Sequence, residues 1–170
     1  MRRVKARLPR TRERAIFRRV RTYLAVIDDQ PEARTALRFA ARRAAKTNGA
    51  IAILALVPAA EFVQWSGVQA AMEEEERLRV EGMVAEAAGA LIKETGLKPD
   101  IIVRQGEPVA VVRALLQQRP DVAALVLGAA AEGGPGPLVA HFAGPDAGKM
   151  TCPVMIIPGA LSDEALDRLS

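Results

Sequence analysis

Five short apolar runs, separated by longer segments of helical character, constrain the fold of this chain more than any other feature. The runs are residues 23–27, 50–57, 101–103, 122–127 and 154–157. Each run is apolar throughout, as strands buried on both faces of a parallel sheet are. Parallel neighbours need a crossover between them, and such crossovers are usually helical and right-handed. The sequence therefore predicts an α/β fold: a five-stranded doubly wound parallel sheet with helices on both faces.

The segments between these runs carry apolar residues at helical spacing. The first helix is expected to begin near Pro31, where proline suits the first turn. A loop through Gly67 leads into a long second helix that ends at Gly96. One apolar face of that helix is formed by Met72, Val80, Val84, Ala87 and Leu91. A third helix begins near Pro108, and a glycine-rich loop, residues 128–144, follows the fourth run.

The charges divide the chain into a basic arm and a mildly acidic remainder. Residues 1–22 contain ten Lys or Arg residues and one acid, Glu13, which gives a net charge of +9. Because the whole chain carries +4, the rest carries −5. We therefore expect a basic N-terminal arm (1–22), an α/β domain (23–158) and a C-terminal tail (159–170).

The basic arm has several candidate partners. A segment with this many cations binds phosphate groups whatever the nucleotide sequence. An anionic membrane or a nucleic acid is therefore a candidate partner for the arm. An acidic protein also fits, because Ala15, Ile16, Phe17 and Val20 form a short apolar stripe at helical spacing. Two alternatives stay open: the arm lies on the acidic domain of its own or a neighbouring subunit, or translation starts later, at a GUG codon for Val20.

The sequence offers few candidates for catalytic residues or metal ligands. The single cysteine, Cys152, excludes an internal disulfide and a multi-cysteine metal site, and an inert buried thiol is expected there. The single histidine, His141, has no nucleophile near it in sequence and is expected on the surface. Glu73 to Glu76 point around a helix and cannot converge on one ion. We expect no catalytic residue, no metal ligand and no enzyme. Without a membrane-length apolar stretch or a signal peptide, we expect a cytoplasmic protein.

Four motifs, in this order and spacing, resemble the universal stress protein family. They are Ala25-Val-Ile-Asp28, Gly106-Glu-Pro108, Asp121-Val-Ala-Ala-Leu-Val-Leu-Gly128 and Cys152-Pro-Val-Met-Ile-Ile157. The resemblance runs from about Tyr23 to Ile157. It implies the strand order 3-2-1-4-5, with the switch point between the first and fourth strands. It also implies a homodimer through the last strand, whose residues are Val154, Met155, Ile156 and Ile157.

The ATP-binding branch of that family matches this chain only in part. Asp28 matches the aspartate that contacts adenine there, and Gly128 matches the first glycine of the phosphate motif. Ala131 stands where the second glycine would be, and twelve residues rather than nine separate it from Gly144. Pro145 then replaces a serine or threonine, which removes both a hydroxyl and a backbone N–H group.

These departures weaken the case for a bound nucleotide. We expect a stress-response regulatory or interaction protein, a homodimer without tight ATP binding and without a cofactor. The alternative is a sensor of an adenine nucleotide, ATP or AMP, or of another small ligand, through a rebuilt glycine-rich loop. Its contacts would be Asp28, Val57, Gly106, Gly128, Gly133, Gly134, Gly136 and Gly144. Asp28 has an alternative of its own, as a capping or loop residue near Pro31.

Overall fold

The structure is a computed structural model, and it describes residues 20–58 and 66–170. The predictions for the basic arm fall almost wholly on residues 1–19, which lie outside the described residues. Among the described residues, no helix is both long and apolar enough to cross a membrane.

All five predicted strands are present and form one parallel sheet. They are β1 (Thr22–Ile27), β2 (Ala50–Val57), β3 (Asp100–Gln105), β4 (Val122–Ala129) and β5 (Val154–Pro158). The strand order is β3-β2-β1-β4-β5, and every neighbouring pair is parallel. The predicted fold class and strand order are therefore confirmed. The central strand β1 is buried along its whole length, which explains why its sequence is apolar without alternation.

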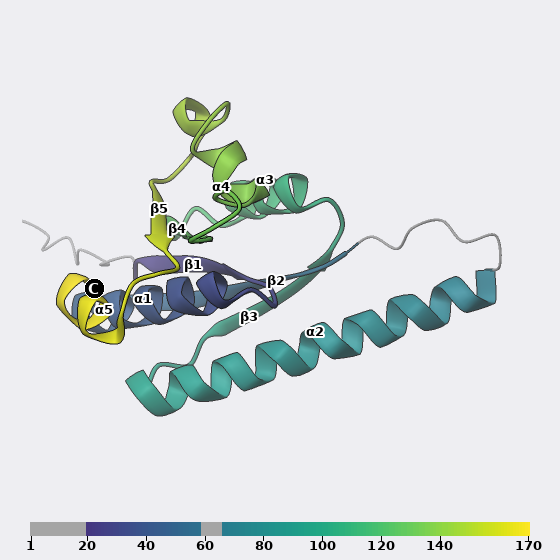
Figure 1. The fold of residues 1–170 in the computed structure, drawn as a ribbon, viewed down its shortest axis with the longest axis horizontal. Coiled ribbons are helices and arrows are strands. Elements are labelled where there is room, and N and C mark those ends of the chain that lie inside the picture. The colour runs from purple at the N-terminus through teal and green to yellow at the C-terminus, as the bar shows by residue number, and fades with distance from the viewer. Residues whose placement is uncertain (1–19, 59–65) are drawn as a thin grey trace, which may run out of the picture.

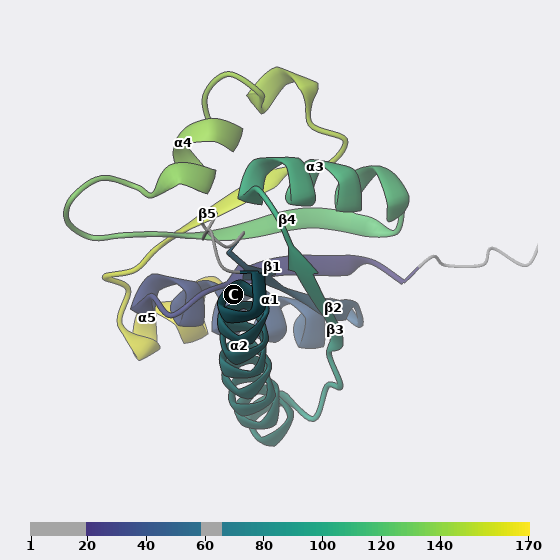
Figure 2. The ribbon, with the colours of Figure 1, turned by 90° about the vertical axis from the view of Figure 1, so that its right-hand side faces the viewer.

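Helices cover both faces of the sheet (Figures 1 and 2). One face holds α1 (Pro31–Thr47), α2 (Ser66–Thr95) and α5 (Asp163–Leu169). The other face holds α3 (Pro108–Gln118) and α4 (Pro137–Phe142), and a 3₁₀ turn, η1 (Ala147–Lys149), follows α4. Each face has its own hydrophobic core, so the sheet is the shared middle layer of a three-layer sandwich.

The first helix shows how the sequence sets its own limits. Pro31 stands at the first turn of α1, where its missing N–H group costs nothing. Asn48 ends the helix in the left-handed conformation, and its N–H donates back to the carbonyl oxygens of Ala44 and Ala45. The buried side of α1 is built mostly from alanines, namely Ala33, Ala36, Ala40, Ala41 and Ala44. These short side chains leave room for the helix to lie close to the sheet.

Three parts of the helical prediction are wrong or incomplete. Gly67 belongs to α2 rather than to a loop before it. Met72 is 54% exposed, although its spacing placed it on the packed face. The reason is visible in Figure 1, where the N-terminal part of α2 extends past the sheet, so that packing begins near Val80. The segment expected only as a C-terminal tail contains α5, whose Leu166 is buried in the core beside α1.

Candidate functional site

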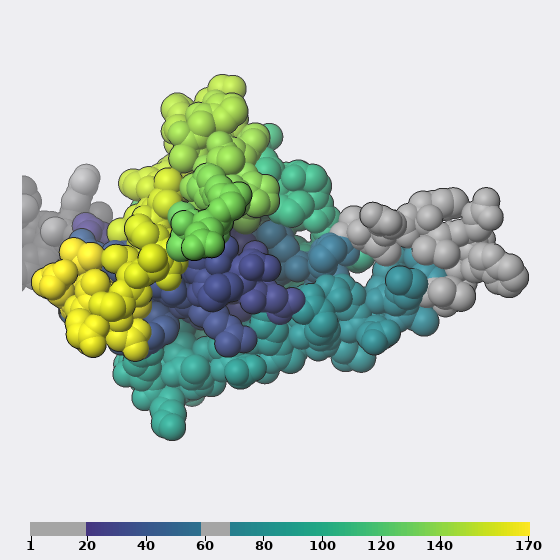
Figure 3. Space-filling view, viewed as in Figure 1, coloured from purple at the N-terminus to yellow at the C-terminus, as the bar shows by residue number. Residues whose placement is uncertain are grey.

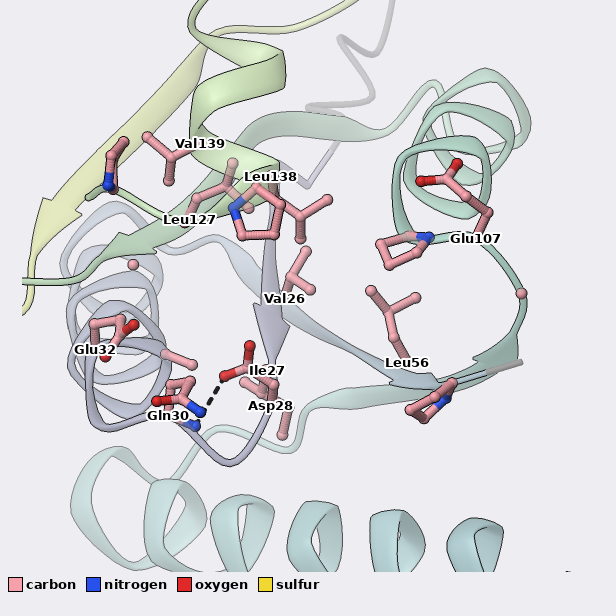
Figure 4. Close-up of a pocket in the computed structure, with 18 residues that line it drawn as sticks. Val26, Ile27, Asp28, Gln30, Glu32, Leu56, Glu107, Leu127, Leu138 and Val139 are labelled. Atoms are coloured by element: carbon pink, nitrogen blue, oxygen red, sulfur yellow. Dashed lines mark hydrogen bonds between the residues drawn. The ribbon is translucent and has the colours of Figure 1, made fainter. Parts of the chain in front are cut away.

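A cleft of about 520 Å³ opens at the carboxyl ends of β1 and β4, where the strand order reverses. Doubly wound sheets bind their ligands at such a switch point. The cleft walls are mostly apolar and include Val26, Ile27, Leu56, Leu127, Leu138 and Val139. Figure 4 shows Val26, Leu127 and Leu138 gathered on one side, with Leu56 facing them from β2. The cleft can therefore enclose a small, largely apolar group.

The polar side chains of the cleft are acidic or neutral. They are Asp28, Gln30, Glu32 and Glu107. No Lys, Arg or His stands among the described residues that line the cleft. Three carboxyl groups, in a lining whose described residues include no cation, make this an unfavourable place for an anion.

Asp28 serves the loop after β1 as well as the cleft. Its Oδ1 accepts a hydrogen bond from the backbone N–H of Gln30, at 3.0 Å, and so holds the turn that leads into α1. Figure 4 shows the same carboxylate directed toward the cleft. The loop alternative for Asp28 is thus observed, and its side chain is also placed to meet a ligand.

Glu107 caps the helix on the opposite rim. Its two carboxylate oxygens accept hydrogen bonds from the backbone N–H groups of Val109 (3.0 Å) and Ala110 (2.7 Å) at the start of α3. These two bonds hold the pKa of Glu107 below its ordinary value, the bond to Ala110 most. The cap therefore also fixes a negative charge at the cleft. Sequence reasoning identified the turn at Gly106-Glu-Pro108 but not this role, although an acid directly before a helix-starting proline signals it.

The structure brings together half of the eight candidate contacts. Asp28, Gly106, Gly128 and Gly136 line the cleft. Val57 does not, because strand alternation turns it into the core on the other face, where it is 3% exposed, while Leu56 and Pro58 line the cleft. Gly133 and Gly134 lie in the loop before α4, and Gly144 lies after it, all three outside the lining.

Two of these glycines have a packing reason that is independent of any ligand. A Cβ atom at Gly128 would stand 2.3 Å from the carbonyl oxygen of Glu32, in the first turn of α1. A Cβ atom at Gly144 would stand 2.6 Å from the carbonyl oxygen of Ala140. Both positions therefore require glycine for close backbone approach within the subunit.

Comparison with known proteins assigns the chain to a protein family. The model of the universal stress protein family matches residues 19–158. The chain belongs to the universal stress protein family. A comparison with curated proteins finds no match.

Solved structures of universal stress proteins share the fold. UspA from Lactobacillus plantarum has 16% identity and a TM-score of 0.68, over 81% of this chain and 97% of that one. A family protein from Burkholderia pseudomallei has 15% identity and a TM-score of 0.64, over 83% and 98%. A universal stress protein in complex with cAMP has 16% identity and a TM-score of 0.57, over 81% and 96%. At such identities the likeness shows the fold alone.

A second polar cluster in this universal stress protein domain lies beside α4, outside the residues that line the cleft. His141 Nε2 stands 3.0 Å from Asp146 Oδ2, and the Arg113 guanidinium donates to the same carboxylate. The Arg113 hydrogen bond, and then that of His141, hold the pKa of Asp146 below its ordinary value. The cluster ties α3 to the turn after α4. No hydroxyl or thiol belongs to it, so its members act as a brace in this geometry.

The cysteine and the glutamates of α2 do not form a catalytic or metal-binding arrangement among the described residues. Cys152 is partly buried, and this burial raises the pKa of its thiol, as an unreactive cysteine requires. Within residues 20–58 and 66–170, no three His, Cys, Asp or Glu side chains are placed to hold a metal ion. Glu74 and Glu76 pair with Arg77 and Arg79 along the exposed side of α2.

Proposed function

We propose that this universal stress protein is a regulatory protein that acts through protein contacts, as a homodimer, and does not hold ATP tightly. The observation that carries the proposal is the charge of the cleft. Asp28, Glu32 and Glu107 supply three carboxyl groups, and the described lining supplies no cation to offset them.

A triphosphate is a poor match for this cleft. Phosphate sites combine backbone N–H groups and helix N-termini with cationic side chains. Here α4 begins with Pro137, which has no N–H group to offer. Pro145, after α4, also lacks a backbone N–H group. Gly128 is occupied by its contact with the first turn of α1. The acidic side chains of the cleft would also repel a triphosphate, for which this loop already offers few N–H donors.

Nucleotide content of the purified protein tests the proposal. Nucleotide released by heating and quantified by chromatography is expected far below one equivalent per subunit. Calorimetric titration with ATP is expected to give a Kd no tighter than about 0.1 mM, or roughly −5.5 kcal/mol. A near-equimolar ATP or ADP content, or a micromolar Kd for ATP, would overturn it.

A second candidate function is sensing of a small ligand with little negative charge. Its support is the apolar cleft of about 520 Å³, which lies within the range of small-molecule pockets and has the Asp28 carboxylate directed toward it. The relative in complex with cAMP shows that a protein of this fold holds an adenine compound. Uncharged adenosine is then expected to bind more tightly than AMP, and AMP more tightly than ATP. The opposite order would exclude this sensor, and Asp28→Ala is expected to weaken adenosine binding.

The homodimer is proposed through β5. This strand ends the sheet next to β4, and its Ile156 is 39% exposed. A bare apolar edge strand invites association, and a twofold dimer closes it off. Light scattering of the purified protein is expected to give at least a dimer, and Ile156→Lys is expected to break the β5 contact and so to lower the mass of the assembly. A monomer at micromolar concentration would contradict this part of the proposal.

A further inference from the structure

The outward face of α2 carries an apolar stripe that no described part of the subunit covers. The stripe is Leu78, Gly82, Ala85, Gly89 and Ile92, all exposed to solvent. Their spacing alternates between four and three residues, which is the spacing of a helix-pairing seam. The other face of the same helix packs into the core through Val80, Val84, Ala88 and Leu91.

The two glycines of this seam are unfavourable for the helix that contains them. Glycine is the poorest helix former apart from proline. Gly82 and Gly89 stand in the middle of α2, and apart from their chain neighbours and the nearby backbone of the helix itself, no described atom lies within 4 Å of where their Cβ atoms would be. Neither has a positive φ. Close packing inside the described subunit and backbone conformation therefore give no reason for glycine at these positions.

The large members of the seam are also left without cover by the residues that the structure describes. Leu78 is 56% exposed and Ile92 is 41% exposed. Figure 1 shows α2 as the outermost element on its side of the sheet, and Figure 3 shows its long flank open to solvent. Small residues at the centre and larger ones toward both ends form a shape that a second helix can fit closely.

We propose that α2 pairs with α2 of a second copy of this chain, in antiparallel orientation about a twofold axis. In the register that places Gly82 opposite Ala85 of the second copy, Leu78 lies opposite the second copy's Gly89. The large Leu78 then faces a glycine, the two small residues Gly82 and Ala85 face each other, and the two helix axes approach closely. The symmetric repeat of each contact makes the interface isologous, so it closes without forming fibres.

The charges beside the seam favour the antiparallel orientation. Glu75 continues the seam toward the N-terminus of α2, and in this register it comes beside Lys93 of the second copy. Arg79, which also pairs with Glu76 and Asp29 inside its own subunit, comes near the second copy's Glu86. A parallel pairing in register would place Glu75 against its own copy. Opposite charges across such a seam set orientation and partner choice.

This surface is separate from the cleft and from β5. If β5 also pairs, and the two twofold axes intersect at right angles, the two contacts join four copies in the dihedral arrangement that is common among soluble oligomers. The α2 contact therefore needs a protein in which β5 pairing has been disabled, and Ile156→Lys supplies that background.

Sedimentation of full-length variants tests the proposal. The Ile156→Lys protein is expected to remain a dimer through α2. Adding Gly82→Glu and Gly89→Glu is expected to raise its dissociation constant at least tenfold, while circular dichroism stays that of a folded protein because both positions are exposed. Ala90→Glu, also exposed but off the seam, is the matched control and is expected to leave the dimer unchanged. A monomeric Ile156→Lys protein, or an equal effect of the control, would overturn the proposal.

Disulfide trapping checks the register independently of stability. In a Cys152→Ser background, a mixture of the Gly82→Cys protein and the Ala85→Cys protein is expected to give covalent dimers under mild oxidation. Ala90→Cys is expected to give none. Cross-linking of the control but not of the seam pair would place the contact elsewhere, and cross-linking of neither would remove it.

Discussion

Gly128 at the end of β4 lies against the carbonyl oxygen of Glu32 in the first turn of α1, with no room for a side chain between them. We expect Gly128→Ala to lower the free energy of unfolding by roughly 1–3 kcal/mol, because the strand and the helix must move apart. Urea denaturation measures this change.

Gly148→Ala is the matched control for that prediction. Gly148 lies in η1, and beyond its immediate chain neighbours and local helix backbone no described atom lies within 4 Å of a Cβ position. Its substitution is therefore expected to change stability by no more than about 0.5 kcal/mol. If Gly128→Ala proved as neutral as Gly148→Ala, the packing explanation for Gly128 would be wrong, and a ligand-binding reason would regain weight.

The strands of this fold are largely predictable because burial on both faces removes every polar residue from their centres. The edge strand β3 shows the limit of that signal. Its apolar run, residues 101–103, is shorter than Asp100–Gln105, because Arg104 and Gln105 lie exposed at the sheet edge. Pairing with β2 through the backbone, rather than side-chain burial, extends the strand there.

The cleft could be placed from sequence, but its character could not. Parallel topology places a site at the carboxyl ends of the strands, and the strand order implied by the family resemblance places it between β1 and β4. That Val57 points away, and that Gly128 is needed for packing, depend on strand register and on the close approach of α1. The brace between His141 and Asp146 depends on the turn after α4, and a loop rich in glycine and proline carries no periodic signal for it.

The C-terminal helix α5 is expected to contribute to the stability of the domain. Leu166 is 1% exposed in the core beside α1, and Lys46 Nζ donates to the carbonyl oxygens of Asp167 (3.0 Å) and Ser170 (2.7 Å). Leu166→Ala should lower the free energy of unfolding by about 2–5 kcal/mol. Leu169→Ala, at a position 52% exposed, should change it by less than about 0.5 kcal/mol. Equal effects in thermal and urea denaturation would mean that α5 is not docked in solution.

Stability should fall in acid partly through Asp121. Its carboxylate accepts hydrogen bonds from Arg119 (2.8 Å) and from the Thr22 hydroxyl (2.8 Å), and these hold its pKa well below the ordinary value, Arg119 most. A depressed pKa in the folded state gives stability that is complete above the unfolded pKa of about 4 and is lost as pH falls below it.

Asp121→Asn tests this linkage. The variant should be less stable than the parent at pH 7, by only about 1 kcal/mol because solvent screens a carboxylate that is 38% exposed. The gap should narrow as pH falls from 5 toward 2. Urea midpoints for both proteins across this range provide the measurement, and a gap independent of pH would assign the effect to hydrogen bonding alone.

The basic arm makes a prediction that depends on charge alone. Ten cations within residues 1–22 should bind vesicles containing phosphatidylserine, or a DNA duplex, with an affinity that falls steeply as salt rises. The slope of log K against log salt counts the phosphates contacted, because each contact releases a condensed counterion. A shortened protein that begins at Arg21 should bind neither surface, since the remaining domain is net acidic. Fluorescence anisotropy with labelled DNA and vesicle sedimentation separate the two partners. Equal binding by both proteins, or none by either at low salt, would leave the arm without this role and favour its contact with the acidic domain.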